Sequence, residues 1–537
     1  MAELTREECI TEEGKIINIT VTGCKLEENS TLNICPCCCP LCCNGDGNGN
    51  GNGDGNGNGN GNGNGDGNGD GNGNGNGDGD GNGDGDGSGD GDANDDDKPG
   101  GLDLTLAGTT GLDMFYDLKK TDDGYVVYGH SNSPASGSSV LCTFQHDLSF
   151  GGQMVYKGGT DGAKTPKPWT KFLRSRDGQG WILPRACGYV DYNSFQGLGL
   201  ISADGSSKAI KHQTTFRPYA KGNMVFNSGL AFPQDYSGSA SYAFAIDGGG
   251  PALVLAMDGE LNRLACVTLT GATMQVNGLN LKDNKLYVAG RVESLFEGKN
   301  GGVIYRFNDT FEQEMVLAFG YETNMSFKFM RNTSYGYLLA GHVTDKIDGK
   351  QNILLLGLDE EFNVIKRAML GGDGDETLDS LELSAGGNIL LCGRTNSFGA
   401  GGLDYFIMRL DEDFAITKEL TFGSSSAESY PCAGVFNADG SVTLVGSTAA
   451  AGAGNYDGFI VTFRGGWKDL TGGVPKYPAL RVNGKPGFQV KNTEFDLILN
   501  DKTTLSSAVY TPKALSLKFT SDNTQALVID PNAVTGV

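Results

Sequence analysis

Cysteine thiols are concentrated in one short stretch of the sequence, NICPCCCPLCC, which spans residues 33–43. With two cysteines upstream they form a set of eight: Cys9, Cys24, Cys35, Cys37, Cys38, Cys39, Cys42 and Cys43. Thiols and thiolates form disulfides, bind thiophilic metals such as Zn²⁺, and accept lipids. This cluster is the highest concentration of reactive side chains in the chain, and the segments around it determine which of these reactions it can serve.

Four interpretations of the cysteine cluster stay open. Disulfides within or between chains suit a small module that has no core of its own in an oxidising environment. Metal binding is indicated by C-x-x-C-like spacings, although the prolines are unlike a zinc ribbon. The segment also resembles cysteine-string segments, which implies lipidation. Compositional drift is the fourth interpretation.

A run of glycine alternating with Asn or Asp follows the cysteines over residues 44–92, within a low-complexity segment that ends at residue 100. Its side chains are too small to offset chain entropy by burial, which predicts a disordered tether. The stretch DGDGSGDGDAND matches the opening of a calcium loop, with these candidate ligands: Asp84, Asp86, Ser88, Asp90 and Asp95. Low-complexity sequence produces such matches by chance, so a flexible tether, Ca²⁺ binding and an ordered glycine-rich helix all remain open.

Charge and hydropathy exclude several classes of protein. The formal net charge is −24, and thirteen of the acidic residues lie between Asp46 and Asp97. Because no basic groove or stripe is apparent, nucleic acid is not an expected partner. No apolar window is long enough for a transmembrane helix. The first 30 residues lack the apolar region of a secretory signal, so the chain is expected to be cytoplasmic, to reach the cell surface or a virion by another route, or to derive from a longer precursor.

From residue 102 to residue 473 the chain repeats itself. A strand-ending glycine recurs at Gly129, Gly188, Gly290, Gly341, Gly393 and Gly446, and the last three intervals are 51, 52 and 53 residues. A polar residue that ends the next strand recurs at Asp147, Asp204, Asp258, Asn308, Asp359 and Asp411. One further unit has a degenerate glycine near SYAFAID, and in another Arg464 replaces the polar residue. With these two units included, the period predicts seven units.

Each unit contains short β-rich segments bounded by glycine, such as YVVYG, YLLAG and ILLCG. Repeated units of four strands predict a seven-bladed β-propeller, because a single blade buries too little to be stable. The last blade has two candidates for its closing strand, DLTLAGTTG at 103–111 and WKDLTGG at 467–473. The five cysteines in this region are expected to act as small core hydrophobes: Cys142, Cys187, Cys266, Cys392 and Cys432.

The segment GGNILLCGRTNSFGAGGLDYFIMRLDEDFAITKELTFG at 386–423 is similar to the repeat of secreted or surface bacterial and archaeal β-propellers. Those repeats pair a GGY-[IV]-[VL]-x-G-x-T-x-S strand and loop with D-x-x-[IV]-x-[KR]-L-D and a closing T-x-G-G. The resemblance covers about 102–473 and implies the fold and an extracellular location. It implies no single activity, because propellers host many functions.

Positions that follow the strand-ending glycine are candidates for a ligand-binding face: His130, Tyr189, Arg291, His342 and Arg394. The alternative is that they are solvent-exposed strand ends. Tyr189, Tyr192, Tyr405 and Tyr456, with the carboxylates of Asp404 and Asp457, also suit a glycan site, unless they merely begin the third strand. No His–Glu–His spacing, nucleophile elbow or phosphate loop occurs, so the chain is not expected to be an enzyme.

Four regions are therefore expected: a cysteine-rich anchor (1–43), a tether (44–100), the seven-bladed propeller (101–473) and a small C-terminal β module (474–537). The strand-like segment KIINITVTG at 15–23 is expected to pair within the chain or with another sheet. This layout predicts a structural or adhesive subunit of a filament, appendage or virion fibre, which self-assembles or joins another subunit through its N-terminal region. The alternative is a glycan- or receptor-binding propeller, and a propeller enzyme is the third hypothesis.

Overall fold

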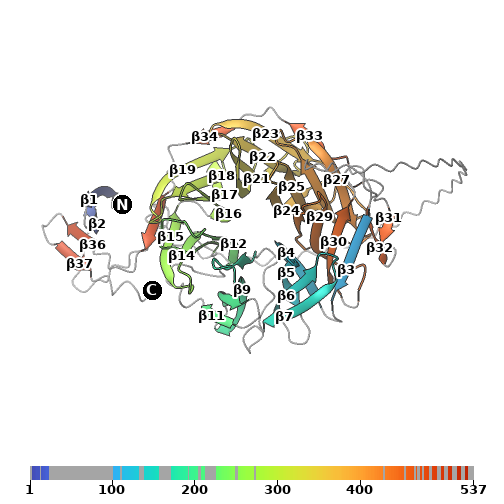
Figure 1. The fold of residues 1–537 in the computed structure, drawn as a ribbon. Coiled ribbons are helices and arrows are strands. Elements are labelled where there is room, and N and C mark those ends of the chain that lie inside the picture. The colour runs from blue at the N-terminus through green and yellow to red at the C-terminus, as the bar shows by residue number, and fades with distance from the viewer. Residues whose placement is uncertain are drawn as a thin grey trace, which may run out of the picture. The chain divides into compact units, whose positions relative to one another are not determined.

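The computed structural model in Figure 1 contains strands and no α-helix in the residues that it describes. These residues are 3–11, 14–22, 101–108, 112–131, 138–156, 171–190, 193–202, 207–211, 225–247, 252–270, 274–426, 428, 430–452, 455–464, 467, 472–474, 477–482, 487–492, 497–500, 506–510, 517–521 and 526–529. Residues 25–93 form a unit separate from the rest of the chain, and none of them is described. The expected all-β propeller is confirmed, and in the described residues no helix is long and apolar enough to cross a membrane.

The strands of the propeller form sheets that follow one another around a central opening (Figure 1). The first sheets along the chain are β4 (Asp113–Thr121), β5 (Gly124–Ser131), β6 (Ser138–Gln145) and β7 (Phe150–Tyr156); β8 (Leu173–Arg174), β9 (Gly180–Val190), β10 (Asn193–Ser202) and β11 (Ser207–Lys211); and β12 (Val225–Ala231), β13 (Tyr242–Asp247), β14 (Leu253–Met257) and β15 (Arg263–Thr270). The next are β16 (Met274–Lys282), β17 (Lys285–Phe296), β18 (Lys299–Phe307) and β19 (Gln313–Gly320); and β20 (Met325–Thr333), β21 (Gly336–Thr344), β22 (Gln351–Leu358) and β23 (Val364–Gly371).

The last two sheets are β24 (Glu376–Leu383), β25 (Ile389–Thr395), β26 (Asp404–Leu410) and β27 (Ile416–Gly423); and β28 (Ala433–Phe436), β29 (Val442–Thr448) and β30 (Asp457–Arg464) with β3 (Gly101–Ala107). The period predicted seven blades. Six sheets are described with side chains on every strand, and the remaining unit, β8–β11, is described mainly as a four-stranded backbone.

The final sheet is completed from the N-terminal side of the propeller. β3 pairs antiparallel with β30 from Gly101↔Arg464 to Ala107↔Gly458. This pairing selects one of the two candidate closing strands, whereas the competing segment supplies part of β31 (Gly472–Val474) in another sheet. Both ends of the repeat region therefore contribute to one sheet.

In four sheets the recurring glycine lies opposite a β-bulge in the innermost strand. In β20 the register with β21 shifts between Phe327 and Phe329, so Lys328 is the extra residue opposite Gly341. A Cβ atom on Gly341 would stand 1.9 Å from the backbone oxygen of Ser326. The bulge brings the two backbones too close for any side chain at this position. The same bulge occurs in four other sheets, opposite Gly129, Gly290 and Gly393, and opposite Ile246 in the unit whose landmark is degenerate.

The second landmark caps the hairpin that follows the third strand. Oδ1 of Asp411 accepts the N–H groups of Asp413 and Ala415, both at 2.9 Å. Phe414, three residues after the cap, is buried with φ 66°, a conformation unusual for a bulky residue. In the first unit the equivalent turn begins at Gln145 and not at the predicted Asp147, because the N–H of Leu148 bonds to the oxygen of Gln145.

Apolar side chains on both faces of each sheet pack against the neighbouring sheets, which forms the core. Phe115 of β4, for example, packs with Val445 of β29 and Ile460 of β30. Four of the scattered cysteines are buried thiols, as expected for small core hydrophobes: Cys142, Cys266, Cys392 and Cys432. The side chain of Cys187 lies outside the described residues.

The residues expected to form a separate C-terminal β module do not do so as far as residue 510. They add one strand to the outer edge of each of four successive sheets: β32 (Tyr477–Val482) pairs with β27, β33 (Gln489–Asn492) with β23, β34 (Ile498–Asn500) with β19, and β35 (Ser506–Tyr510) with β15. The carboxylate of Glu419 accepts the N–H groups of Gly487 and Phe488 at 3.0 and 2.9 Å, which fixes this segment to the sheet of β24–β27.

A separate sheet combines strands from the N-terminal and C-terminal regions: β1 (Glu3–Thr11), β2 (Gly14–Thr22), β36 (Leu517–Ser521) and β37 (Ala526–Ile529). β2 pairs in parallel with β36, which confirms that the N-terminal segment pairs within its own chain. Cys9 lies in β1 opposite Ile16, and only its backbone is described. The other seven clustered cysteines and the five candidate calcium ligands lie outside the described residues, so those hypotheses stay predictions.

Candidate functional site

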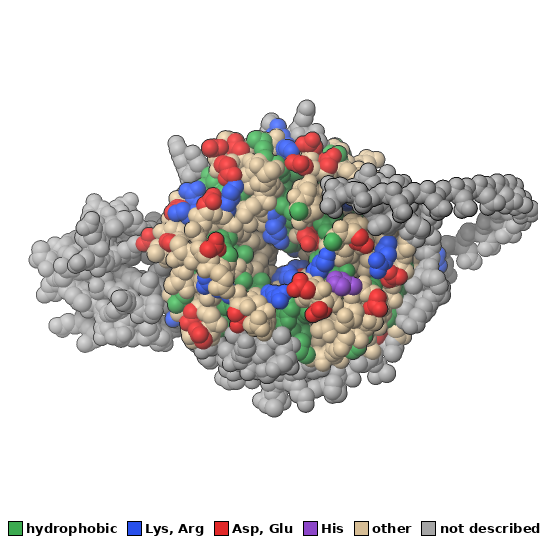
Figure 2. All heavy atoms as spheres, in the orientation of Figure 1, with side chains coloured by type: hydrophobic (Ala, Val, Ile, Leu, Met, Phe, Trp, Pro, Cys, Tyr) green, Lys and Arg blue, Asp and Glu red, His purple; other side chains and the backbone are tan. Residues whose placement is uncertain are grey.

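The innermost strands of the sheets line a central channel with a volume of about 1450 Å³. Figure 2 shows Lys and Arg side chains gathered around its opening. Side chains of β4, β12, β16, β20, β24 and β28 supply most of the wall. Because the bulge turns the extra residue of an inner strand out of the regular alternation, side chains at that position can reach the channel.

The bulge residues connect neighbouring sheets through hydrogen bonds. Asn227 donates to the oxygen of Val276 at 2.9 Å, and Asn277 donates to the oxygen of Phe327 at 3.3 Å. Lys328 donates in the same way to the oxygen of Leu378. Each accepting oxygen precedes the bulge residue of the next sheet, so the side chains form a relay along the wall.

The relay ends at Asp379, whose carboxylate can only accept hydrogen bonds. Arg394 holds it with two contacts, 2.8 Å to Oδ2 and 3.2 Å to Oδ1, and Lys328 lies 3.5 Å from Oδ1. Burial alone would raise the pKa of Asp379, but Arg394 and Lys328 hold it below its usual range. Asp379 is therefore an ionised carboxylate in the wall of the channel.

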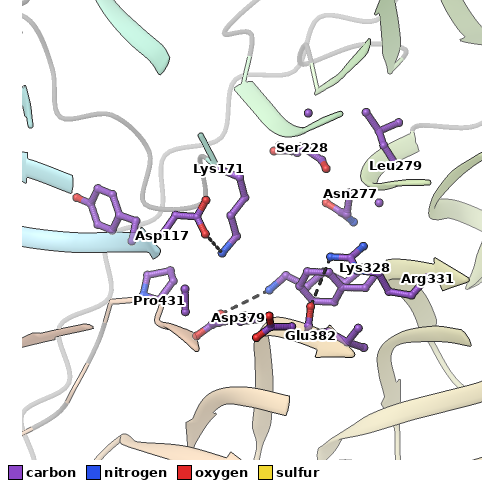
Figure 3. Close-up of a pocket in the computed structure, with 18 of the residues that line it drawn as sticks. Asp117, Lys171, Ser228, Asn277, Leu279, Lys328, Arg331, Asp379, Glu382 and Pro431 are labelled. Carbon is purple, nitrogen blue, oxygen red and sulfur yellow. Dashed lines mark hydrogen bonds and ion pairs between the residues drawn. The ribbon is translucent and has the colours of Figure 1, made fainter. Parts of the chain in front are cut away.

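A second ion pair lies on another side of the channel, where Asp117 accepts from Lys171 at 3.3 Å and from the N–H of Phe172 at 3.2 Å (Figure 3). Lys119 is 3.4 Å from the same carboxylate. Burial opposes ionisation of Asp117, yet Lys119 and Lys171 lower its pKa. The ammonium groups of Lys171 and Lys328 point toward the same part of the cavity (Figure 3).

The predicted ligand-face positions differ in their exposure to the channel. Arg291 and His342 line the channel, whereas Arg394 and His130 are buried; the side chain of Tyr189 is outside the described residues. Nε2 of His342 accepts the N–H of Leu378 at 2.9 Å, so this nitrogen carries no proton. Burial, together with Lys328 and Arg394, lowers the pKa of His342 to about 3, and its ring is neutral.

The predicted glycan-binding pair of Tyr405 and Asp404 is not on a surface. Both side chains are fully buried, and the hydroxyl of Tyr405 donates to the oxygen of Ser447 at 2.8 Å. Asp457 is buried as well. These residues begin the third strand of their sheets, which was the alternative interpretation of the pattern.

Lys171, Lys328 and Asp379 were not identified from the sequence. The sequence does contain a signal for two of them, namely their spacing from the recurring glycine. Lys328 precedes Gly341 by 13 residues, and Asp379 precedes Gly393 by 14. Lys171 precedes a two-residue strand and lies outside the repeat pattern. Within the described residues no group of three His, Cys, Asp or Glu side chains is placed to hold a metal ion.

Comparison with known proteins gives distant structural likenesses. No family model matches the chain, and no curated protein matches it. A glucose dehydrogenase has 13% sequence identity and a TM-score of 0.31, covering 54% of this chain and 96% of its own. The polysaccharide lyase Uly1 has 9% identity and a TM-score of 0.31, covering 65% and 89%. An exo-β-1,3-galactanase from Clostridium thermocellum has 11% identity and a TM-score of 0.29, covering 71% and 99%.

The expectation that the chain is not an enzyme is corrected by this comparison, because all three solved structures are enzymes. Their low identities and TM-scores transfer no activity, substrate or residue role to this chain. The assignment to secreted or surface propellers has no matching family model, and it rests on the resemblance of the repeat alone.

Proposed function

We propose that the propeller is a binding head that takes part of a saccharide into its central channel. The observation that carries this proposal is a channel of about 1450 Å³ lined by hydroxyl, amide and charged side chains from several sheets. Ligand pockets for small molecules occupy roughly 300–1,000 Å³, so the channel has room for more than one sugar residue.

The wall contains the kinds of groups that recognise hydroxyl-rich ligands. Ser228 and Asn277 supply hydroxyl and amide groups, and the partly exposed Leu230 and Val435 supply apolar surface. Side chains held by the relay are already ordered, so less entropy is lost when a ligand binds. Display of this head from a filament, cell surface or virion through the tether and the cysteine anchor stays a prediction.

Saturation-transfer NMR on the full chain with a panel of neutral and acidic oligosaccharides tests the proposal, and the same spectra report whether a bound sugar is converted. Ser228→Trp fills the channel from the inner strand β12, and Ile347→Trp adds the same side chain on a loop position that is 95% exposed. We expect Ser228→Trp alone to abolish binding. Absence of binding by every saccharide, or binding that survives Ser228→Trp, would refute the proposal.

A further inference from the structure

The described lining of the channel has the opposite charge balance to the chain as a whole. Six cationic side chains line it: Lys119, Lys120, Lys171, Arg291, Lys328 and Arg331. Four acidic side chains line it: Asp117, Asp247, Asp379 and Glu382. In a protein with a formal net charge of −24, a locally cationic channel selects the sign of its ligand.

The acids in this lining already have partners within the wall. Asp117 and Asp379 are held by the ion pairs described above, and Asp247 accepts the N–H of Val276 at 3.0 Å. Glu382 accepts the N–H of Phe436 at 2.7 Å, and burial raises its pKa. Two of the four carboxylates are therefore neutralised by cations of the wall, and the other two accept backbone N–H groups.

Lys328 has only a long ion pair with Asp379 in this arrangement. Arg394 takes both oxygens of Asp379 in the shorter contacts, which leaves Lys328 with one contact of 3.5 Å to that carboxylate. Burial lowers the pKa of Lys328, the charge of Asp379 opposes this shift, and the positive charges of Arg394 and Lys171 add to it. An anion bound near Lys328 would favour its protonated form.

Lys171 and Lys328 approach the same part of the cavity from different segments (Figure 3). Both side chains are 23% exposed, so a ligand in the channel can reach them. Ammonium groups bind oxyanions through charge-assisted hydrogen bonds, which are stronger than those between neutral groups. Ser228 and Asn277 lie on the wall that faces this pair and are placed to bond to hydroxyl groups of the same ligand (Figure 3).

We infer that the channel binds an acidic saccharide and that Lys171 and Lys328 together hold its carboxylate. This inference rests on the proposed function and specifies its ligand class. The carboxylate lies between the two ammonium groups and relieves their mutual repulsion. The sugar hydroxyls then contact the amide and hydroxyl side chains of the facing wall.

The experiment compares one ligand scaffold in two charge states, an oligogalacturonate and its methyl ester, by isothermal titration against the full chain. We expect the acid form to bind at least about tenfold more tightly, because hydrogen bonds to charged groups contribute about 1.5–3 kcal/mol. Its affinity falls as ionic strength rises, whereas that of the ester does not. Equal affinities for the two forms, both abolished by Ser228→Trp, would overturn the anion inference and leave the proposed function standing. If neither form binds, the acidic-saccharide inference fails, and the wider saccharide panel decides the proposed function separately.

Variants locate the binding to the two lysines. Lys171→Gln and Lys328→Gln remove the charge, Lys328→Arg keeps it, and Lys346→Gln is a matched control on a side chain that is 62% exposed. We expect each Gln variant to lose about tenfold of the affinity for the acid form and none for the ester, with binding largely retained by Lys328→Arg. Thermal unfolding of each variant shows whether it is folded, and the comparison of acid with ester on the unmodified chain does not depend on that result. Unchanged affinity in a folded Lys328→Gln variant would contradict the assignment.

Discussion

Replacing Glu428 with glutamine tests a buried carboxyl at the junction between two propeller sheets. Its Oε1 accepts the hydroxyls of Ser424 and Thr448 at 3.0 and 3.1 Å, while Oε2 meets no donor among the described residues. Oδ1 of Asp404, which is also fully buried, lacks a donor in the same way. Because an unmet buried acceptor is costly, a proton on one of these carboxyls is favoured.

The size of the effect follows from the pKa of Glu428. Burial raises it from 4.5 to about 7, the two hydroxyls oppose this shift, and the charge of Asp404 adds to it. A carboxyl whose pKa is raised on folding gives its full stability below the unfolded pKa and loses it as the pH rises through the folded value. The unmodified chain should therefore lose about 3 kcal/mol between about pH 4.5 and pH 7 from this group. Glu428→Gln stays neutral and avoids that loss.

Urea unfolding of both proteins at several pH values between 4.5 and 8 measures the difference directly. The difference is the useful quantity, because the lowered pKa of His342 gives both proteins a slope of opposite sign below its unfolded pKa. Relative to the unmodified chain, Glu428→Gln should gain about 3 kcal/mol between pH 4.5 and pH 8. The control Glu361→Gln, at an exposed position, should show no such gain. A pH-independent difference for Glu428→Gln would refute the assignment of a buried, protonated carboxyl.

Three further predictions concern the fold and the channel. Gly341→Ala should destabilise the chain by about 1–3 kcal/mol, because the new Cβ clashes with backbone, whereas Gly152→Ala, which meets only an ordinary contact at 3.6 Å, should cost little by the same urea assay. Phe488→Ala should release the C-terminal strands to limited proteolysis while the propeller stays folded, because Phe488 packs on Phe398 at 4.8 Å; equal protection of the variant would contradict this. The ring signals of His342 should not titrate in NMR spectra between pH 8 and pH 4, and a midpoint near 6.5 would show that the ring is not buried as described.

The propeller was predictable because its repeat leaves backbone signatures in the sequence. A glycine recurs where a bulge removes the space for a Cβ atom, as at Gly341, and a polar cap recurs at each hairpin, as at Asp411. Both requirements are local, so they persist when other positions vary. In the first unit the turn residue was predicted wrongly, because Asp147 lies two residues after the residue that begins the turn, Gln145. The side chain of Asp147 nevertheless accepts the N–H of Ser149, as a capping residue does.

The charges of the channel and the path of the C-terminal strands were not predictable in the same way. A bulge residue shows no hydrophobic period, and its side chain meets groups from another unit, as Lys328 meets Asp379. The C-terminal strands alternate like any half-buried strand, and such alternation does not say which sheet edge they join. Their partners follow from the open outer edges of the propeller sheets, a property of the assembled ring.

The relay also explains the charged groups at Lys328, Asp379 and Arg394. Asparagine at positions 227 and 277 both occupies the bulge and donates to the next sheet, so it completes the wall without adding charge. Lysine at 328 makes the same bond but brings a cation, and aspartate at 379 cannot donate at all and requires Arg394. The bulge position is thus charged in two adjacent sheets and neutral in the sheets of Asn227 and Asn277. The result is a cation at Lys328, an anion at Asp379 and the buried guanidinium of Arg394. Structural need accounts for the asparagines, whereas the lysine and the aspartate add charge that the relay itself does not need, and that charge is what a ligand in the channel meets.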